Sequence, residues 1–169
     1  MFRLIFSIIL VVFQPAMAVE TSEQSDAAEP KITKHDDWML RCVKPVDAEE
    51  FCEAIQAILI NREQVSGRVL ETSLRRLNDD QIVMQFVLPF GVDLRPGIAF
   101  RIDENEERKA GFLTCLQQGC LVQMLANKEL LAELKKGTMA KLGFRPLGSE
   151  ETVVVEISLK GFSASTNNL

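Results

Sequence analysis

Apolar and polar residues alternate with a period of two along most of the chain from Trp38 onward, which is the pattern of half-buried β-strands. Trp38, Leu40 and Cys42 would share one face of the first such run. Residues 81–88 are apolar on both faces, which predicts a central strand. Together the runs predict about nine short strands and a mostly β fold, a β-sandwich. The predicted strands are 38–43, 51–60, 68–74, 81–88, 98–102, 109–115, 120–124, 139–144 and 152–159.

One short helix interrupts this pattern. Asn127 can cap its start, Leu130, Leu131 and Leu134 form its apolar stripe, and Gly137 ends it. The helix would cover part of the sandwich.

The first 18 residues have the layout of a secretory signal peptide. Arg3 is followed by the apolar run 4–13, and Ala16-Met17-Ala18 forms the cleavage site, so we expect cleavage after Ala18. The alternative is a membrane anchor, but that requires about 20 apolar residues. No second long apolar segment follows, so no transmembrane segment is expected after cleavage. The expected location is the periplasm or the outer envelope, or the protein is secreted.

The remaining roughly 150 residues suit a single domain. Residues 19–36 are small, polar and acidic, and are expected to be a flexible lead-in. The sandwich domain would span 37–164, and a polar tail would follow at 165–169.

Charge argues against a nucleic-acid partner. The formal net charge is −5, and removing a signal whose one charged residue is Arg3 makes it more negative. Acidic chains repel phosphate backbones. The expected partner is therefore a protein, in the envelope or on a host cell.

Four cysteines lie in the expected mature part: Cys42, Cys52, Cys115 and Cys120. An even number in an exported protein favours two disulfides. Three pairings are possible, and the short spacings favour Cys42–Cys52 and Cys115–Cys120. Zinc binding or redox catalysis would call for C-x-x-C pairs, which are absent.

The chain offers no recognisable catalytic set. His35 is the single histidine and falls in the expected lead-in, so a Ser-His-Asp or Cys-His arrangement is not expected. The acidic clusters at 79–80 and 103–107 resemble solvated turns, and they lack the pattern of a calcium loop. We expect no enzyme activity, no metal site and no cofactor.

Three other residues have two interpretations each. Trp38, beside a cysteine, is expected in the core rather than in a ligand platform. Gln56 lies on the inward face of its strand, where it would satisfy a buried backbone group. Phe90, in a loop rich in Pro and Gly, either anchors a partner or plugs the end of the sandwich.

Five segments in order resemble the bacterial invasion-associated locus B family, over residues 38 to 164. The loop 88–97 resembles that family's LPxGVxLxxG motif. The resemblance implies an immunoglobulin-like β-sandwich, an envelope location and a role in host-cell invasion, and it brings no catalytic residues. The matching segments are Trp38…Cys42…Cys52…Gln56, Leu88–Gly97, Cys115–Cys120, Leu134–Gly137 and Ser158–Phe162.

Two functions follow from these observations. The first is a non-catalytic envelope interaction module that aids host-cell invasion. The second is a periplasmic accessory factor, chaperone-like or inhibitor-like, for another envelope protein.

Overall fold

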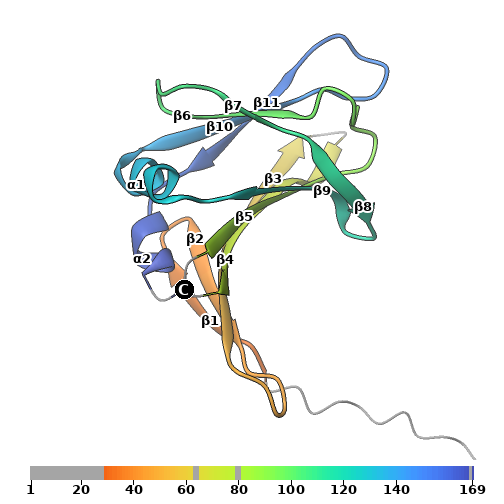
Figure 1. Cartoon of the computed structure of the whole chain (residues 1–169). Helices are drawn as coiled ribbons and strands as arrows, with labels where there is room; N and C mark the ends of the chain where they lie inside the picture. The colour runs from red at the N-terminus through yellow and green to blue at the C-terminus, as the bar shows by residue number, and fades with distance from the viewer. Residues whose placement is uncertain (1–28, 63–64, 79–80, 168) are drawn as a thin grey trace, which may run out of the picture.

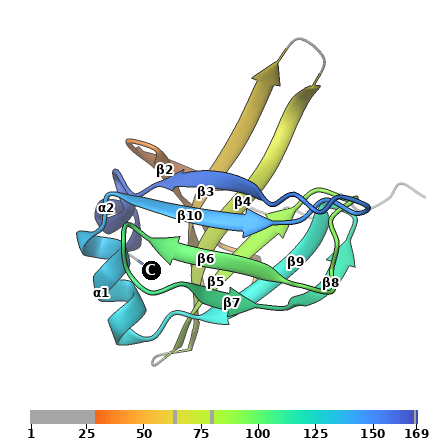
Figure 2. The ribbon, with the colours of Figure 1, turned by 90° about the horizontal axis from the view of Figure 1, so that it is seen from above.

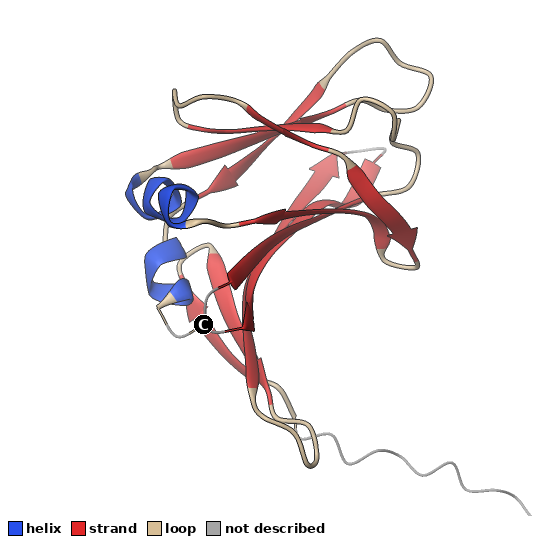
Figure 3. Ribbon diagram, in the orientation of Figure 1, coloured by secondary structure: helices blue, strands red, loops and turns tan. Residues whose placement is uncertain are grey.

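The computed structural model describes residues 29–169 except 63–64, 79–80 and 168. The expected signal peptide and residues 19–28 lie outside these residues. The described chain forms two antiparallel sheets and two short helices (Figures 1 and 3). In chain order the elements are β1 (Lys31–His35), β2 (Trp38–Val43), β3 (Phe51–Arg62), β4 (Val65–Asn78), β5 (Gln81–Leu88), β6 (Ile98–Ile102), β7 (Arg108–Ala110), β8 (Phe112–Leu116), β9 (Gly119–Leu125), α1 (Lys128–Lys136), β10 (Met139–Phe144), β11 (Val153–Ser158) and α2 (Phe162–Thr166).

The two sheets pack face to face, which confirms the mostly β, sandwich-like prediction. The larger sheet has seven strands in the order β1-β2-β3-β4-β5-β9-β8, and the smaller has four in the order β11-β10-β6-β7. The first five strands are therefore each other's neighbours in chain order. The loop between β5 and β6 carries the chain from one sheet to the other, and both helices lie at one end of the two sheets (Figure 3).

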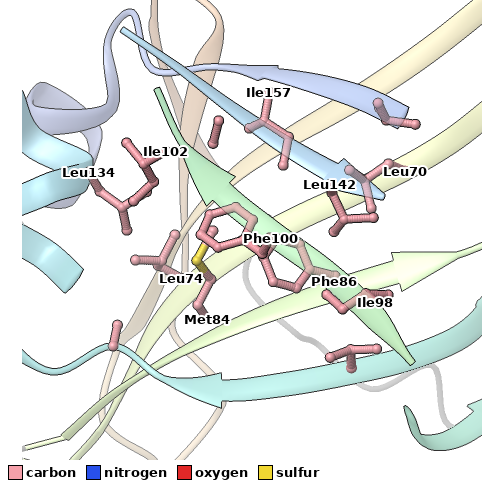
Figure 4. Close-up of a cluster of buried hydrophobic side chains, with 14 of the residues drawn as sticks. Leu70, Leu74, Met84, Phe86, Ile98, Phe100, Ile102, Leu134, Leu142 and Ile157 are labelled. Carbon is pink, nitrogen blue, oxygen red and sulfur yellow. The ribbon is translucent and has the colours of Figure 1, made fainter. Parts of the chain in front are cut away.

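The core fills the space between the sheets (Figure 4). The rings of Phe86 on β5 and Phe100 on β6 lie 5.2 Å apart between centroids, so each sheet contributes one aromatic side chain. Helix α1 adds Leu134, which is fully buried. The β-strand alternation thus brings the apolar faces of the two sheets together, as the sequence predicts.

Trp38 is buried, as predicted. Its exposed fraction is 0%, and its ring packs edge-on against Phe162 with centroids 5.1 Å apart. The indole Nε1 donates a hydrogen bond to the carbonyl of Ser158 at 2.8 Å. Trp38 therefore joins β2 to the C-terminal part of the chain and is not a surface platform for a ligand.

Gln56 also satisfies backbone groups, as predicted. Its Nε2 donates to the carbonyls of Asp37 at 3.1 Å and Ser158 at 3.0 Å. Only 5% of the residue is exposed. The amide therefore bridges the start of β2 to the end of β11.

The expected flexible lead-in is wrong for its last residues, because Lys31–His35 form β1. β1 pairs with β2 along its whole length, from Lys31 opposite Cys42 to His35 opposite Trp38. Because its side chains are mostly exposed, this segment does not show the alternation of apolar and polar residues that predicts a strand. The strand is held by backbone pairing at the edge of the sheet.

The expected polar tail, 165–169, is wrong for its first two residues, Ser165 and Thr166. Residues 162–166 form α2, a second helix beyond the one predicted. Phe162, Ser165 and Thr166 are all buried. The hydroxyls of Ser165 and Thr166 donate to the carbonyl of Phe162, which lets these polar residues lie in the interior.

Helix α1 closely follows its prediction. The side chain of Asn127 accepts a hydrogen bond from the Leu130 N–H at 2.9 Å, and the Gly137 N–H donates to Glu133. Two other expectations are wrong. The strand predicted at 68–74 is part of the longer β4, which already includes Ser66 and Gly67, and the run 109–115 is divided between β7 and β8.

The structure forms both disulfides that the spacing favours, Cys42–Cys52 and Cys115–Cys120. Each bond joins residues that lie directly opposite each other on neighbouring antiparallel strands, β2 with β3 and β8 with β9. Both bonds lie within the larger sheet. They therefore fix local strand register and do not join the two sheets.

Candidate functional site

The loop between β5 and β6, residues 89–97, is held against the loop between β10 and β11. The N–H of Asp93 donates to the Arg145 carbonyl at 2.8 Å, and the N–H of Leu147 donates to the Gly91 carbonyl at 2.7 Å. Val92 and Pro146 form an isolated antiparallel bridge between these contacts. The two loops therefore behave as one structural unit at one end of the sandwich.

A buried carboxylate fastens this unit. The Asp93 side chain is only 3% exposed, and its oxygens accept from Arg95 Nε at 2.8 Å and Arg145 Nη2 at 2.7 Å. Arg95 adds a second bond from Nη2 at 2.9 Å. The hydrogen bonds from Arg95 and then Arg145 hold the pKa of Asp93 well below its ordinary value. Asp93 is thus a saturated anion suited to holding the loops together, and it is not available as a general base.

Arg145 makes a further contact with the exposed Glu150, with Nη1 and Oε2 3.8 Å apart. Within the described residues its Nε atom is buried and has no hydrogen-bond partner. Arg145 therefore contributes mainly through Asp93.

Three large apolar side chains project from the two joined loops into solvent. Phe90 is 64% exposed, Leu94 46% and Leu147 68%. We call these three residues the apolar loop surface. Of the two interpretations of Phe90, the plug at the end of the sandwich is wrong, since most of its ring is exposed. The anchor interpretation stays a prediction.

The disulfide hairpin lies beside the start of this loop. Leu88, the last residue of β5, is paired with Cys120 on β9. Gly119, at φ +137°, comes so close to Leu88 that a Cβ there would lie 2.1 Å from the Leu88 carbonyl oxygen. The Cys115–Cys120 bond therefore holds the strand from which the loop departs, whereas Cys42 and Cys52 lie toward the opposite edge of the sheet.

Asp93, Arg145 and Leu147 have no role in the site predicted from the sequence. An aspartate inside an otherwise apolar loop, followed two residues later by Arg95, was the available signal. Arg145 carried no such signal, since it lies 52 positions from Asp93.

A polar hollow of about 610 Å³ lies on the outer face of the larger sheet. Much of its charge is paired, through Arg41 with Glu53 and Arg68 with Glu71. Paired side chains on an open sheet face resemble ordinary solvated structure more than a catalytic cleft.

His35 does not lie in a flexible segment, because β1 places it opposite Trp38. Across the part of the chain that the structure describes, no three His, Cys, Asp or Glu side chains are grouped to hold a metal ion. In that same part, neither helix has the length and apolar character to span a bilayer.

The fold and the site together define a small disulfide-bonded β-sandwich with three exposed apolar side chains on two joined loops. Residues 38–169 match the family described as "Invasion associated locus B (IalB) protein". The chain belongs to this family.

Relatives support this assignment. An invasion protein B homolog of Brucella abortus (strain 2308) is 31% identical over 139 residues, which cover 80% of this chain and 76% of the relative. A homolog from Brucella abortus biovar 1 (strain 9-941) matches with the same figures. The crystal structure of invasion associated protein B from Bartonella henselae has the same fold, with a TM-score of 0.71 at 22% identity. It covers 82% of this chain and 93% of its own.

Proposed function

We propose that this protein is an exported, non-catalytic interaction module of the bacterial envelope that aids host-cell invasion. Its contact with a protein partner is made by the apolar loop surface, Phe90, Leu94 and Leu147. The observation that carries this proposal is the exposure of these three side chains on loops that Asp93 holds rigid. Interface anchors are commonly aromatic residues, and a fixed loop loses little entropy on binding.

Export is the second part of the proposal. The signal-like segment 1–18 supports it, as do two disulfides, which persist in oxidising compartments. The names of the Brucella and Bartonella relatives support the link to invasion. The mature chain then begins at Val19 and resides in the periplasm or outer envelope, or is secreted.

Gene deletion with complementation tests the role. Deletion is expected to reduce host-cell invasion, and the wild-type gene restores it. A gene carrying Phe90→Ser and Leu147→Ser is expected to fail, although its product folds. Ile32→Ser is a matched control, because Ile32 is 60% exposed but lies on β1 at the other edge of the larger sheet.

Two results would count against this function. If deletion changes neither invasion nor envelope integrity, the proposed role is wrong. Affinity capture from periplasm that returns one stoichiometric envelope protein, with invasion unchanged, favours the chaperone-like or inhibitor-like accessory factor. Mass spectrometry of the periplasmic fraction tests export separately, because the mature chain should begin at Val19.

A further inference from the structure

Strand β11 forms an open edge of the four-stranded sheet, because β10 is its one neighbour there. The N–H of Leu159 donates to the Thr138 carbonyl at 3.0 Å, which fixes the bonded pairs of the β10–β11 ladder. Bonded and non-bonded pairs alternate in an antiparallel ladder. The backbone groups of Val155 and Ile157 therefore point to β10, and those of Val154 and Glu156 point to the open edge.

The contacts at Ser158 agree with this direction. Its carbonyl is on the same edge and accepts from Trp38 Nε1 and Gln56 Nε2. At Ser158 the side chains of Trp38 and Gln56 therefore occupy the edge, and no added strand can pair there. Among the described residues, no strand pairs with Val154 or Glu156 on this side.

A groove runs along the open edge. One part, of about 550 Å³, lies between β11 and the large sheet, with Ile58, Ile60 and Val69 as its apolar wall. A second hollow of about 370 Å³ is also lined by Ile58 and Glu156, so it adjoins the first along the same edge. The groove ends at Gln56, which bridges the two sides.

The opposite side of the groove is an open strand edge too. β2 pairs with β3 from Phe51 to Ile55, but β3 continues to Arg62. Beyond Gln56, β3 therefore has a partner on the β4 side and none on the β2 side among the described residues. Figure 2 shows this end of β3 and β4 projecting past the four-stranded sheet.

We propose that this groove binds an extended segment of a partner protein by strand addition to β11. Unpaired edge groups beside an apolar groove are the requirements of that binding mode. The occupant is a single strand and not a second copy, because the whole sheet of a second copy would meet the projecting β3–β4 arm (Figure 2).

Charge defines the pattern of the segment. Glu156 is exposed and makes no ion pair within the described residues, and its neighbour across the ladder on β10 is Lys141. On the open side a Lys or Arg placed opposite Glu156 completes an opposite-charge row. The residues on either side of it point to the wall of Ile58, Ile60 and Val69. The segment is therefore apolar–basic–apolar, and this basic character suits a chain of net charge −5.

Peptide binding to the purified, disulfide-bonded mature protein tests the proposal. The probe is an eight-residue peptide of alternating Val and Thr with one central Lys, and its partner probe has Glu in place of Lys. Wild-type protein is expected to bind the Lys peptide several-fold more tightly. Glu156→Lys is expected to reverse that preference, whereas Glu150→Lys, at a side chain that is 99% exposed outside the groove, is not.

Val154→Pro tests the backbone contribution. Proline removes an N–H that faces the open edge and leaves the ladder to β10 intact. Binding is expected to weaken roughly tenfold, since a peptide carbonyl loses its donor. Circular dichroism verifies the fold, and the Glu156→Lys reversal remains a test if this variant unfolds.

Three outcomes overturn the proposal: no binding at millimolar peptide, equal binding of the two peptides, or binding unchanged by a folded Val154→Pro protein. A concentration-dependent dimer that Val154→Pro dissociates, seen by sedimentation, would instead assign the edge to a second copy. The proposal does not depend on the apolar loop surface, so Phe90→Ser should leave peptide binding unchanged.

Discussion

The amide of Gln56 donates to the carbonyl of Ser158 at 3.0 Å across 102 positions of sequence. This bond joins the middle of β3 to the end of β11 and so crosses from one sheet to the other. The same carbonyl accepts from Trp38. One backbone oxygen near the C-terminus is therefore a meeting point for the two sheets.

Gln56→Leu is expected to lower the free energy of unfolding by about 1–3 kcal/mol, because two part-buried hydrogen bonds, to the carbonyls of Asp37 and Ser158, are lost while the side-chain volume is kept. Urea unfolding followed by the fluorescence of Trp38, the one tryptophan, measures the change. Gln123→Leu is the control. Gln123 donates to Gln85 in the half-exposed hollow of the outer face, and its replacement should cost well under 1 kcal/mol. Equal losses in both variants would contradict the importance of the Gln56 bridge.

Replacing Cys42 and Cys52 together by Ser is expected to cost about 2–3 kcal/mol of unfolding free energy, and the pair Cys115 and Cys120 slightly less. The order follows from loop length, since the bonded residues are 10 and 5 positions apart. Guanidinium unfolding of the two double variants measures both losses. A larger loss for the 115–120 pair would show that the chain-entropy argument does not govern this protein.

Gly161→Ala is expected to cost about 2–4 kcal/mol. Gly161 has φ +87°, and a Cβ there would lie 1.9 Å from the His35 carbonyl oxygen, so the backbone of β1 or α2 must move. Gly148→Ala separates the two causes. Gly148 has φ +80° with no atom near its Cβ position, so its cost should be only the backbone strain of about 1–2 kcal/mol. Thermal unfolding of both variants gives the comparison, and equal melting temperatures would rule out the steric contribution.

The contribution of the Asp93 carboxylate to the free energy of unfolding should decrease at acid pH. Because folding lowers the pKa of Asp93, its contribution to stability is full above the ordinary carboxyl pKa of about 4 and is lost as the pH falls through the lowered value. Asp93→Asn is therefore expected to be less stable than wild type between pH 5 and 7, and the difference should shrink below about pH 4. Urea unfolding across this range measures the difference.

Glu150→Gln is the control for Asp93→Asn, because it removes a charge near the same Arg145 from a side chain that is 99% exposed. Its stability should stay close to that of wild type throughout. A difference between Asp93→Asn and wild type that is independent of pH would contradict an ionic role for Asp93.

The sequence predicted best where the side-chain pattern itself carries the structural information. Gln81–Leu88, Ile98–Ile102 and Met139–Phe144 have the predicted bounds, because buried faces impose apolar residues at fixed intervals. β1 was missed since its stability comes from the backbone of β2 and not from its own side chains. The helix α2 was missed because buried Ser165 and Thr166 read as polar tail residues.

At the candidate site, the loop composition singles out Phe90, but it does not predict whether the ring points into the core or into solvent. Whether an aromatic ring points inward or outward depends on the neighbouring loop at Leu147, which sequence spacing does not place. The Asp93–Arg145 pair could not be predicted for the same reason, because it joins the β5–β6 loop to the β10–β11 loop, which are far apart in sequence. Such contacts follow from the fold and cannot be read from local pattern.

The contacts of Trp38 bear on the order in which the chain can fold. A chain that emerges with its N-terminus first can pair β2 through β5 by successive hairpins. The indole must nevertheless wait for Ser158 and Phe162, more than a hundred residues later. Until those residues are synthesised, Trp38 lacks the ring and the carbonyl that cover it in the folded protein. The segment that follows β11 therefore completes the core late in folding. Shortening this segment should leave an aggregation-prone intermediate populated.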